Sequence, residues 1–271
     1  MATLAEISPL RLPARAAPVA RRGGALALRR VRKVFEVDKR ELRVLDGLDL
    51  ALAPGEFVSL VGSSGCGKST ILRLVVGLDA AYEGEILLDG QPITGPGLER
   101  SIVFQEHRLL PWLTVAENIG IGLSDRPARE RDQLVQEHIA LVGLGGFEKA
   151  YPRQLSGGMA QRAAIARALI TKPEILLLDE PLGALDSLTR TYLQRELLRI
   201  WRQQKITVLM VTHDVEEAVF LSDRIVVLAP RPGRTRTVVD IDLPHPRDRV
   251  DPAFGAIRKE VIAHLEEASS S

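Results

Sequence analysis

The most constraining feature of this sequence is a glycine-rich segment, residues 62–69, which separates an apolar run from a run suited to a helix. The apolar run, Phe57–Val61, predicts a buried β-strand, and a helix is expected from Ser69 to about Gly77. The segment satisfies the pattern G-x-x-x-x-G-K-[S/T] in full. Its glycines let backbone N–H groups surround a phosphate, and the start of a helix adds partial positive charge. The sequence therefore predicts a phosphate-binding loop at the end of a strand.

The side chains of this segment have distinct places in that prediction. Lys68 is expected to reach the β- and γ-phosphates of a nucleotide, Ser69 to ligate Mg²⁺, and Thr70 to lie near the α-phosphate. Cys66 is expected to be a small filler whose thiol can be alkylated unless ATP protects it. The predicted nucleotide-binding residues are Gly62, Ser63, Ser64, Gly65, Cys66, Gly67, Lys68, Ser69 and Thr70.

A second apolar run, residues 175–178, ends in a pair of carboxylates. Ligands of open parallel sheets bind at the carboxyl ends of the strands, where this pair would lie. Asp179 is therefore predicted to hold Mg²⁺, directly or through water, and Glu180 to polarise the water that attacks the γ-phosphate. The alternative is that Asp-Glu simply begins a loop.

Strand-like and helical segments alternate over much of the chain, which predicts an α/β fold with a mostly parallel sheet. Residues 107–165 instead read as helices broken by loops, and we interpret them as a helical insertion. The expected strands are 26–28, 31–34, 48–52, 57–61, 84–89, 102–104, 175–178, 207–211 and 224–228. The expected helices are 69–77, 115–120, 128–142, 157–169, 187–204 and 215–221.

Three regions follow from these patterns. Residues 1–24 are rich in Ala, Arg and Pro and predict a flexible N-terminal arm. Residues 25–230 form the predicted nucleotide-binding domain, and residues 231–271 a C-terminal extension that ends in a helix.

Composition limits the classes of function. A net charge of +1 over 271 residues argues against nucleic acid as a partner, because that binding relies on excess positive charge. The single cysteine cannot form an internal disulfide and suits a reducing cytosol. The apolar runs are far shorter than the ~20 residues of a spanning helix. If the protein works at a membrane, another chain must cross it.

Residues 155–162, with the sequence LSGGMAQR, resemble the signature of the ATP-binding cassette (ABC) family. Four further features occur in the order of that family: Phe35 where an aromatic ring stacks on adenine, Gln105 in the Q-loop, Leu185-Asp186 in the D-loop, and His213 as the switch histidine. The resemblance covers about residues 26–230. It implies a P-loop NTPase of the ABC type, with a mostly parallel core sheet, an antiparallel β subdomain and the helical insertion as a subdomain.

The resemblance also implies an ATPase that works as a head-to-tail homodimer. ATP bound at Lys68 of one copy would be capped by Ser156, Gly157 and Gly158 of the other. His213 would sense the γ-phosphate with Glu180, and Gln105 would contact Mg²⁺ and the attacking water. Three plainer readings stay open: Phe35 as a core aromatic, His213 as a loop histidine, and Gln105 as a surface amide.

Residues 109–112, with the sequence LLPW, are similar to a segment of importer ATPases for nitrate, sulfonates and taurine. Leu109, Leu110 and Trp112 are expected to edge a groove that grips a helix of a membrane subunit, or else to belong to the core. The implied protein is a peripheral ATPase on the cytoplasmic face of the inner membrane. Its partners would be permease subunits and, indirectly, a periplasmic or extracellular binding protein. Aliphatic sulfonate is the preferred cargo, with taurine or nitrate next.

Two other classes stay open. A soluble ABC ATPase acting on ribosomes or DNA is the runner-up, although neither a second cassette nor a long coiled-coil insertion is present. An exporter ATPase encoded apart from its membrane chain is the third. The LLPW segment favours the importer.

Overall fold

The computed structural model describes residues 23–183 and 185–269. The predicted N-terminal arm lies outside these residues except for its last two positions. There Gly24 donates a backbone hydrogen bond to the carbonyl of Glu174, 3.2 Å away, and the Thr207 hydroxyl donates to the Gly24 carbonyl. A Cβ atom on Gly23 would lie 2.5 Å from Oγ1 of Thr207. Contacts with the body of the protein therefore already include Gly23 and Gly24.

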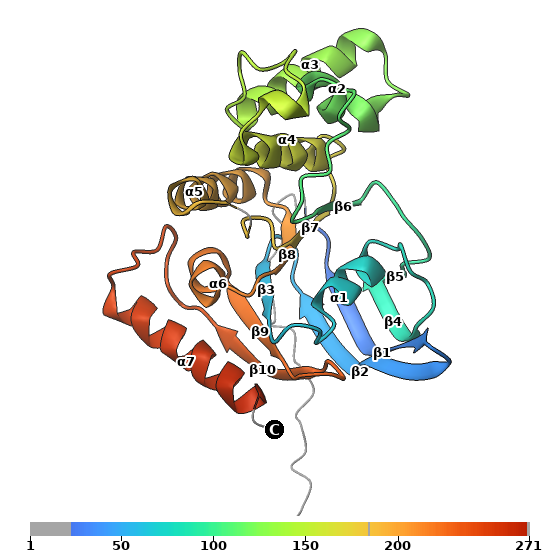
Figure 1. Cartoon of the computed structure of the whole chain (residues 1–271), viewed down its shortest axis with the longest axis vertical. Helices are drawn as coiled ribbons and strands as arrows, with labels where there is room; N and C mark the ends of the chain where they lie inside the picture. Colours follow the sequence, from blue (N-terminus) through green and yellow to red (C-terminus); the bar gives the residue numbers. More distant parts are fainter. Residues whose placement is uncertain (1–22, 184, 270–271) are drawn as a thin grey trace, which may run out of the picture.

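A six-stranded sheet forms the centre of the molecule, in the order β10-β9-β3-β8-β7-β6 (Figure 1). Five of its strands are parallel, and β10 pairs antiparallel with β9. Because β3, β8 and β7 are neighbours, the loops after these three strands begin at one edge of the sheet. The bounds are β3 Phe57–Val61, β6 Arg100–Val103, β7 Ile175–Asp179, β8 Thr207–Val211, β9 Arg224–Leu228 and β10 Thr235–Asp240.

A second, antiparallel sheet has the order β2-β1-β4-β5. Its strands are β1 Leu26–Val37, β2 Arg40–Leu52, β4 Glu83–Leu88 and β5 Gln91–Pro92. The first two are longer than expected, because they pair with each other across register shifts from Leu26 and Leu52 to Val37 and Arg40. The implied antiparallel β subdomain is present.

The two faces of the central sheet belong to different cores. Alternate residues of β3, such as Val58 and Leu60, pack with α1 (Lys68–Val75) and the antiparallel sheet. Their neighbours Phe57 and Val61 face a second core, built with the remaining helices. This alternation follows from the two-residue period of a strand.

The helical insertion forms a separate group of helices at the top of Figure 1. It contains α2 (Val115–Gly120), a short 3₁₀ turn at Ile121–Leu123, α3 (Ala128–Leu141), a second 3₁₀ turn at Pro152–Gln154, and α4 (Gly157–Leu169). These three α-helices contact one another. Thr114 and Glu117 form a capping box that begins α2. No helix among the described residues is long and apolar enough to cross a membrane.

Residues 231–269 of the predicted C-terminal extension add a strand to the central sheet and a helix that packs on the body of the protein. Strand β10 was not predicted, because a short strand at a sheet edge carries little periodic signal and depends on pairing with β9. Helix α7 (Pro252–Ser269) contacts α6 (Val215–Leu221), β9 and β10. Helix α5 (Ser187–Gln204) completes the set of elements.

Candidate functional site

The glycine-rich loop follows β3 directly and leads into α1, as expected. Gly65 and Gly67 adopt φ angles of 79° and 98°, which residues with a Cβ atom rarely adopt. A Cβ atom on Gly67 would also lie 2.7 Å from Leu45. The ammonium of Lys68 donates to the carbonyl oxygens of Gly62 and Ser63, at 2.7 and 3.0 Å. The loop thus folds back around its own lysine, which is only 8% exposed.

The burial of Cys66 fits the expected filler role but not the expected accessible thiol. Its side chain is fully buried, and its sulfur lies 3.9 Å from Nζ of Lys68. Burial raises the pKa of the thiol, against the opposing effect of the Lys68 charge. A buried thiol with a raised pKa is a poor target for alkylation. Cys66 therefore fills space beneath the loop, and its contribution to nucleotide binding would come from its backbone.

Two oxygen groups that could ligate a metal lie close together between α1 and β7. The Ser69 hydroxyl donates a hydrogen bond to Oδ1 of Asp179, 3.1 Å away. Burial raises the pKa of Asp179, while this hydrogen bond from Ser69 opposes the rise. No cluster of three or more His, Cys, Asp or Glu side chains suited to a metal occurs among the described residues. A hydroxyl and one carboxylate fit Mg²⁺ that is held mainly by nucleotide phosphates, because Mg²⁺ prefers oxygen and keeps several non-protein ligands.

Glu180 and His213 form a pair at the ends of β7 and β8. Oε2 of Glu180 lies 3.0 Å from Nδ1 of His213. The backbone of Glu180 takes a left-handed φ of 46°, and its N–H donates to the carbonyl of Val211. This fixed turn aims the carboxylate beyond the strand end. The imidazole is 66% exposed and the carboxylate 25%, so both remain accessible to a substrate.

The side chain of Gln105 lies near Gly183, close to the Glu180 carboxylate. A Cβ atom on Gly183 would lie 3.4 Å from Nε2 of Gln105 and 3.7 Å from Oε2 of Glu180. The amide and the carboxylate therefore flank one point above Gly183. The structure thus brings together six of the predicted site residues, although they come from four separate segments: Lys68, Ser69, Asp179, Glu180, His213 and Gln105.

The Ser-Gly-Gly segment lies elsewhere, at the N-terminus of α4. Ser156 caps this helix by accepting a hydrogen bond from the N–H of Met159. A Cβ atom on Gly158 would lie 2.5 Å from the methyl group of Thr189, so α5 requires a glycine there. Figure 1 shows α4 and α1 in different parts of the molecule. One chain therefore presents the glycine-rich loop and the Ser-Gly-Gly segment as two separate surfaces.

Phe35 belongs to the antiparallel sheet, on β1. Its ring is half-buried against the core of that sheet, and Nζ of Lys33 lies 4.6 Å from the ring centroid. The ammonium of Lys33 is itself held by Asp79 and the carbonyl of Ala81. Stacking of Phe35 on adenine remains a prediction.

Sequence reasoning missed several residues that support the site. Gln161 and Arg167 of α4 donate to backbone carbonyls beside Gln105, and Arg231 donates to the carbonyl of Gly65, 3.1 Å away. Thr212 donates to buried Glu217 and so holds the turn that carries His213. These partners lie at least 57 residues apart except for Thr212 and Glu217, and no local pattern marks the distant pairs.

The profile of the family described as "ABC transporter" matches residues 45–183, about half of the chain. The chain belongs to the ABC transporter family. Its fold is the ABC ATPase cassette, and the helical insertion and paired sheets described above are those the family resemblance implied.

Named relatives agree with this assignment. The chain is 49% identical over 236 residues to the "Aliphatic sulfonates import ATP-binding protein SsuB" of Bacillus cereus, covering 87% of this chain and 94% of the relative. The protein of the same name from Bacillus subtilis is also 49% identical, over 234 residues, 86% of this chain and 91% of the relative. The "Bicarbonate transport ATP-binding protein CmpC" of Synechococcus elongatus is 49% identical over 252 residues, 89% of this chain but 38% of that protein.

Solved structures give the same fold. The dimeric cassette MJ0796, 32% identical, superposes with a TM-score of 0.72 over 81% of this chain and 100% of its own. A dimeric post-hydrolysis state of the same cassette, bound to ADP and Pi, gives 0.71 with the same identity and coverage. The cassette cbiO1 of Clostridium perfringens, 24% identical, gives 0.72 over 88% of this chain and 90% of its own and bears on the fold alone.

Proposed function

We propose that this ABC cassette is the ATP-hydrolysing subunit of an importer for aliphatic sulfonates. The proposed ATPase activity rests on one observation. The Glu180–His213 pair and the Ser69–Asp179 pair lie next to each other at the carboxyl ends of adjacent strands. The ATPase activity and the importer class agree with the named relatives. The cargo rests on those relatives' names.

The residues divide the chemistry between them. Lys68 donates hydrogen bonds to two carbonyl oxygens of the loop, and it would replace them with bonds to the β- and γ-phosphates when ATP binds. Ser69, Asp179 and Gln105 would hold Mg²⁺, which supplies positive charge to the phosphates. Glu180 would accept a proton from the attacking water, and His213 would keep its carboxylate oriented.

A second copy of the chain would complete the site. The exposed N-terminus of α4 offers backbone N–H groups and partial positive charge, which suit a γ-phosphate. Because α4 lies away from α1 in one chain, these groups would cap the nucleotide of a partner in a head-to-tail homodimer. The solved MJ0796 cassettes of similar fold are dimeric, which supports a dimer of this chain.

Docking to a membrane subunit would use the segment after Gln105. Asn118 is fully buried, and its amide holds the carbonyls of Leu110, Leu113 and Thr114, which fixes the turn between them. This turn leaves Trp112 69% exposed, as a contact for a permease requires. Leu109 is buried, so it belongs to the core and not to the edge of a groove. The cassette would then sit at the cytoplasmic face of the inner membrane, with a binding protein delivering cargo from outside.

The cargo is tested by growth of a deletion strain. Loss of the gene should abolish growth on an aliphatic sulfonate as sole sulfur source and leave growth on sulfate intact. The Glu180→Gln variant should fail to restore growth, whereas the wild-type gene restores it. Normal growth of the deletion strain on simple alkanesulfonates, with loss of growth on taurine, nitrate or low bicarbonate, would replace the proposed cargo. Bicarbonate is included because CmpC is as similar in sequence as SsuB.

A further inference from the structure

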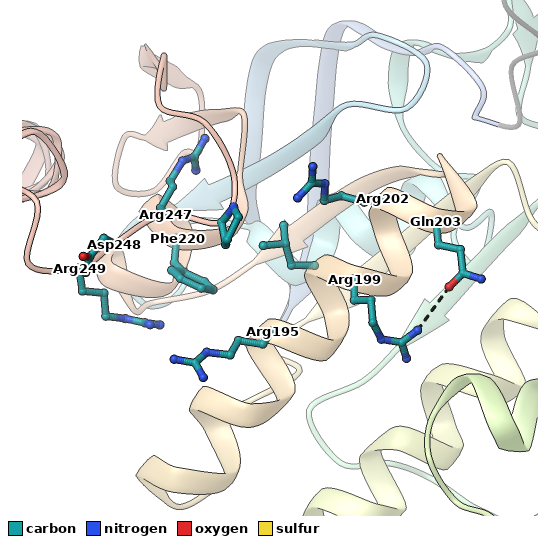
Figure 2. Close-up of a pocket in the computed structure, with 10 residues that line it drawn as sticks. Arg195, Arg199, Arg202, Gln203, Phe220, Arg247, Asp248 and Arg249 are labelled. Carbon is teal, nitrogen blue, oxygen red and sulfur yellow. Dashed lines mark hydrogen bonds between the residues drawn. The ribbon is translucent and has the colours of Figure 1, made fainter.

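A hollow lies away from the ATPase site, between α5 and the segment that leads into α7 (Figure 2). Its volume is about 950 Å³, within the range of sites for small organic ligands. Five arginines line it, and we call it the arginine pocket: Arg195, Arg199 and Arg202 from α5, and Arg247 and Arg249 from the C-terminal segment. The one carboxylate in its lining is Asp248. An excess of positive charge in a concave site favours an anion.

Three of the five arginines are engaged by the protein itself. Arg199 forms an ion pair with Glu196, and Arg249 forms one with Glu216 at 2.8 Å. Arg247 is buried and donates to backbone carbonyls, among them that of Leu243. These three shape the pocket and are not spare cations.

The other two arginines have no carboxylate partner in the described part of the chain. Arg195 is exposed and makes no hydrogen bond or ion pair with a described residue. Arg202 is exposed, and its contact is a long one, 3.4 Å from Nη1 to the carbonyl of His245. Arg195 and Arg202 occupy positions i and i+7 on one face of α5, with the paired Arg199 between them.

The pocket also has apolar parts. Leu198 and Phe220 lie beneath it, and Pro246 and the methylene stems of the arginines add further apolar surface. The guanidinium of Arg249 stacks on the Phe220 ring, 4.0 Å from its centroid. In Figure 2 Arg195 extends toward the side of Phe220 and Arg249, whereas Arg202 extends toward the other end. Seven residues of helix separate these two arginines by roughly 10 Å along the axis.

We propose that the arginine pocket binds a small organic anion with a phosphate or sulfonate head and a compact apolar body. The planar guanidinium groups match the oxygens of such a head, and the body would cover Pro246 and Leu198. A bound anion would tie α5 to residues 246–249 of the C-terminal segment. The head chemistry is shared by transported sulfonates and by cellular phosphate esters, and the proposal does not depend on the cargo proposed above.

Calorimetric titration of the protein saturated with MgADP tests this, because the nucleotide fills the glycine-rich loop, which also attracts anions. The four probes are phenyl phosphate, benzenesulfonate, inorganic phosphate and inorganic sulfate. At least one organic probe should bind saturably and at least about fivefold more tightly than its inorganic head. Preference for benzenesulfonate would indicate a sulfonate source, and preference for phenyl phosphate a phosphate ester.

The decisive variant is the double substitution Arg195→Gln and Arg202→Gln. Both side chains are exposed, so folding should not suffer, and affinity for the organic probe should fall at least about tenfold. The matched control, Arg129→Gln with Lys259→Gln, removes the same charge from exposed positions outside the pocket and should bind as the wild type does. Ligand should also slow amide hydrogen exchange in residues 241–251 of the wild type.

Three outcomes would overturn the proposal. One is equal affinity in the double variant and the wild type. Another is no saturable binding of any of the four probes. The third is binding of an acidic peptide that depends on Arg195 and Arg202 while the organic probes do not bind, which would assign the pocket to a protein partner.

Discussion

The side-chain amide of Gln161 donates a hydrogen bond to the carbonyl oxygen of Phe104, 3.2 Å away. Arg167, further along the same helix, donates to the carbonyls of His107 and Arg108 at 3.0 and 2.8 Å. Helix α4 thus carries the Ser-Gly-Gly segment at its start and holds both sides of Gln105 with its side chains. A displacement of the segment around Gln105 would therefore be passed to the surface that is proposed to cap the nucleotide of a partner chain.

Replacing Gln161 with Leu should weaken this connection. The Phe104 carbonyl would lose its partner, at a cost of about 1 kcal/mol, and ATP turnover should fall about five- to tenfold. Nucleotide affinity should stay at the wild-type value, because Gln161 does not contact the glycine-rich loop in the structure. Steady-state phosphate release and nucleotide titration measure the two quantities. The control is Gln136→Leu, an exposed position on α3, and equal turnover in both variants would contradict the connection.

Replacing Lys68 with Ala should weaken nucleotide binding. The ammonium is the group placed to meet the β- and γ-phosphates, and a charge-assisted hydrogen bond contributes about 1.5–3 kcal/mol. Affinity for ATP should fall roughly 10- to 100-fold, as measured by fluorescence titration. Lys149→Ala, on the exposed surface, serves as the control. Unchanged affinity and turnover in the Lys68 variant would remove the assignment of the loop.

Replacing Glu180 with Gln should separate binding from hydrolysis. The amide keeps the size of the side chain but cannot accept the proton from water, so turnover should fall about 10²–10⁴-fold. ATP should then hold two chains together, and gel filtration with ATP should show a dimer. Glu106→Gln, an exposed carboxylate next to Gln105, is the control. Normal hydrolysis with only monomer present would show that Glu180 is not the base.

Replacing Ser156 with Arg should block closure of the dimer while each monomer still binds nucleotide. The large side chain would stand at the N-terminus of α4, where the partner's γ-phosphate is proposed to lie. Ser156→Ala separates this bulk from the loss of the helix cap, which alone costs about 1 kcal/mol of stability. Turnover should be lost in the arginine variant and largely kept in the alanine variant. Wild-type turnover with arginine would rule out capping by a partner.

Glu217 should make stability depend on pH. Burial raises its pKa from 4.5 to about 7, with Asp214 adding to the rise and the hydrogen bond from Thr212 opposing it. Between these two values the folded protein binds the proton more tightly than the unfolded chain does. The free energy of unfolding should therefore fall by up to a few kcal/mol as pH rises from about 4.5 to 7. Above about pH 7 this group should cause no further change.

Urea unfolding of the wild type and of Glu217→Gln at pH 5 and pH 8 measures this effect. The amide cannot ionise, so the free energy of unfolding of the variant should not fall through this group between pH 5 and pH 8. Relative to the wild type, the variant should therefore be more stable at pH 8 than it is at pH 5. If the difference in free energy of unfolding between the two proteins is the same at pH 5 and pH 8, Glu217 does not titrate in this range.

The sequence by itself determined the phosphate loop, the Asp179–Glu180 pair and the Ser-Gly-Gly segment. In each case the signal is local: glycines at fixed spacing, an apolar run that ends in carboxylates, or a polar residue that begins a helix. The alternation of strands and helices also predicted the parallel sheet, because each element buries an apolar face of its own period. The bounds of β1 and β2 needed the tertiary structure, since pairing across register shifts sets their length.

Only the tertiary structure decided how these parts combine. Ser69 contacts Asp179, and Glu180 contacts His213, because β3, β8 and β7 are neighbours in the sheet. The order of the strands cannot be predicted from the hydrophobic period of any single segment. Burial of Cys66 was decided in the same way, by what packs around the loop. The arginine pocket likewise depends on the C-terminal segment returning to α5, a long-range contact that composition and spacing do not encode.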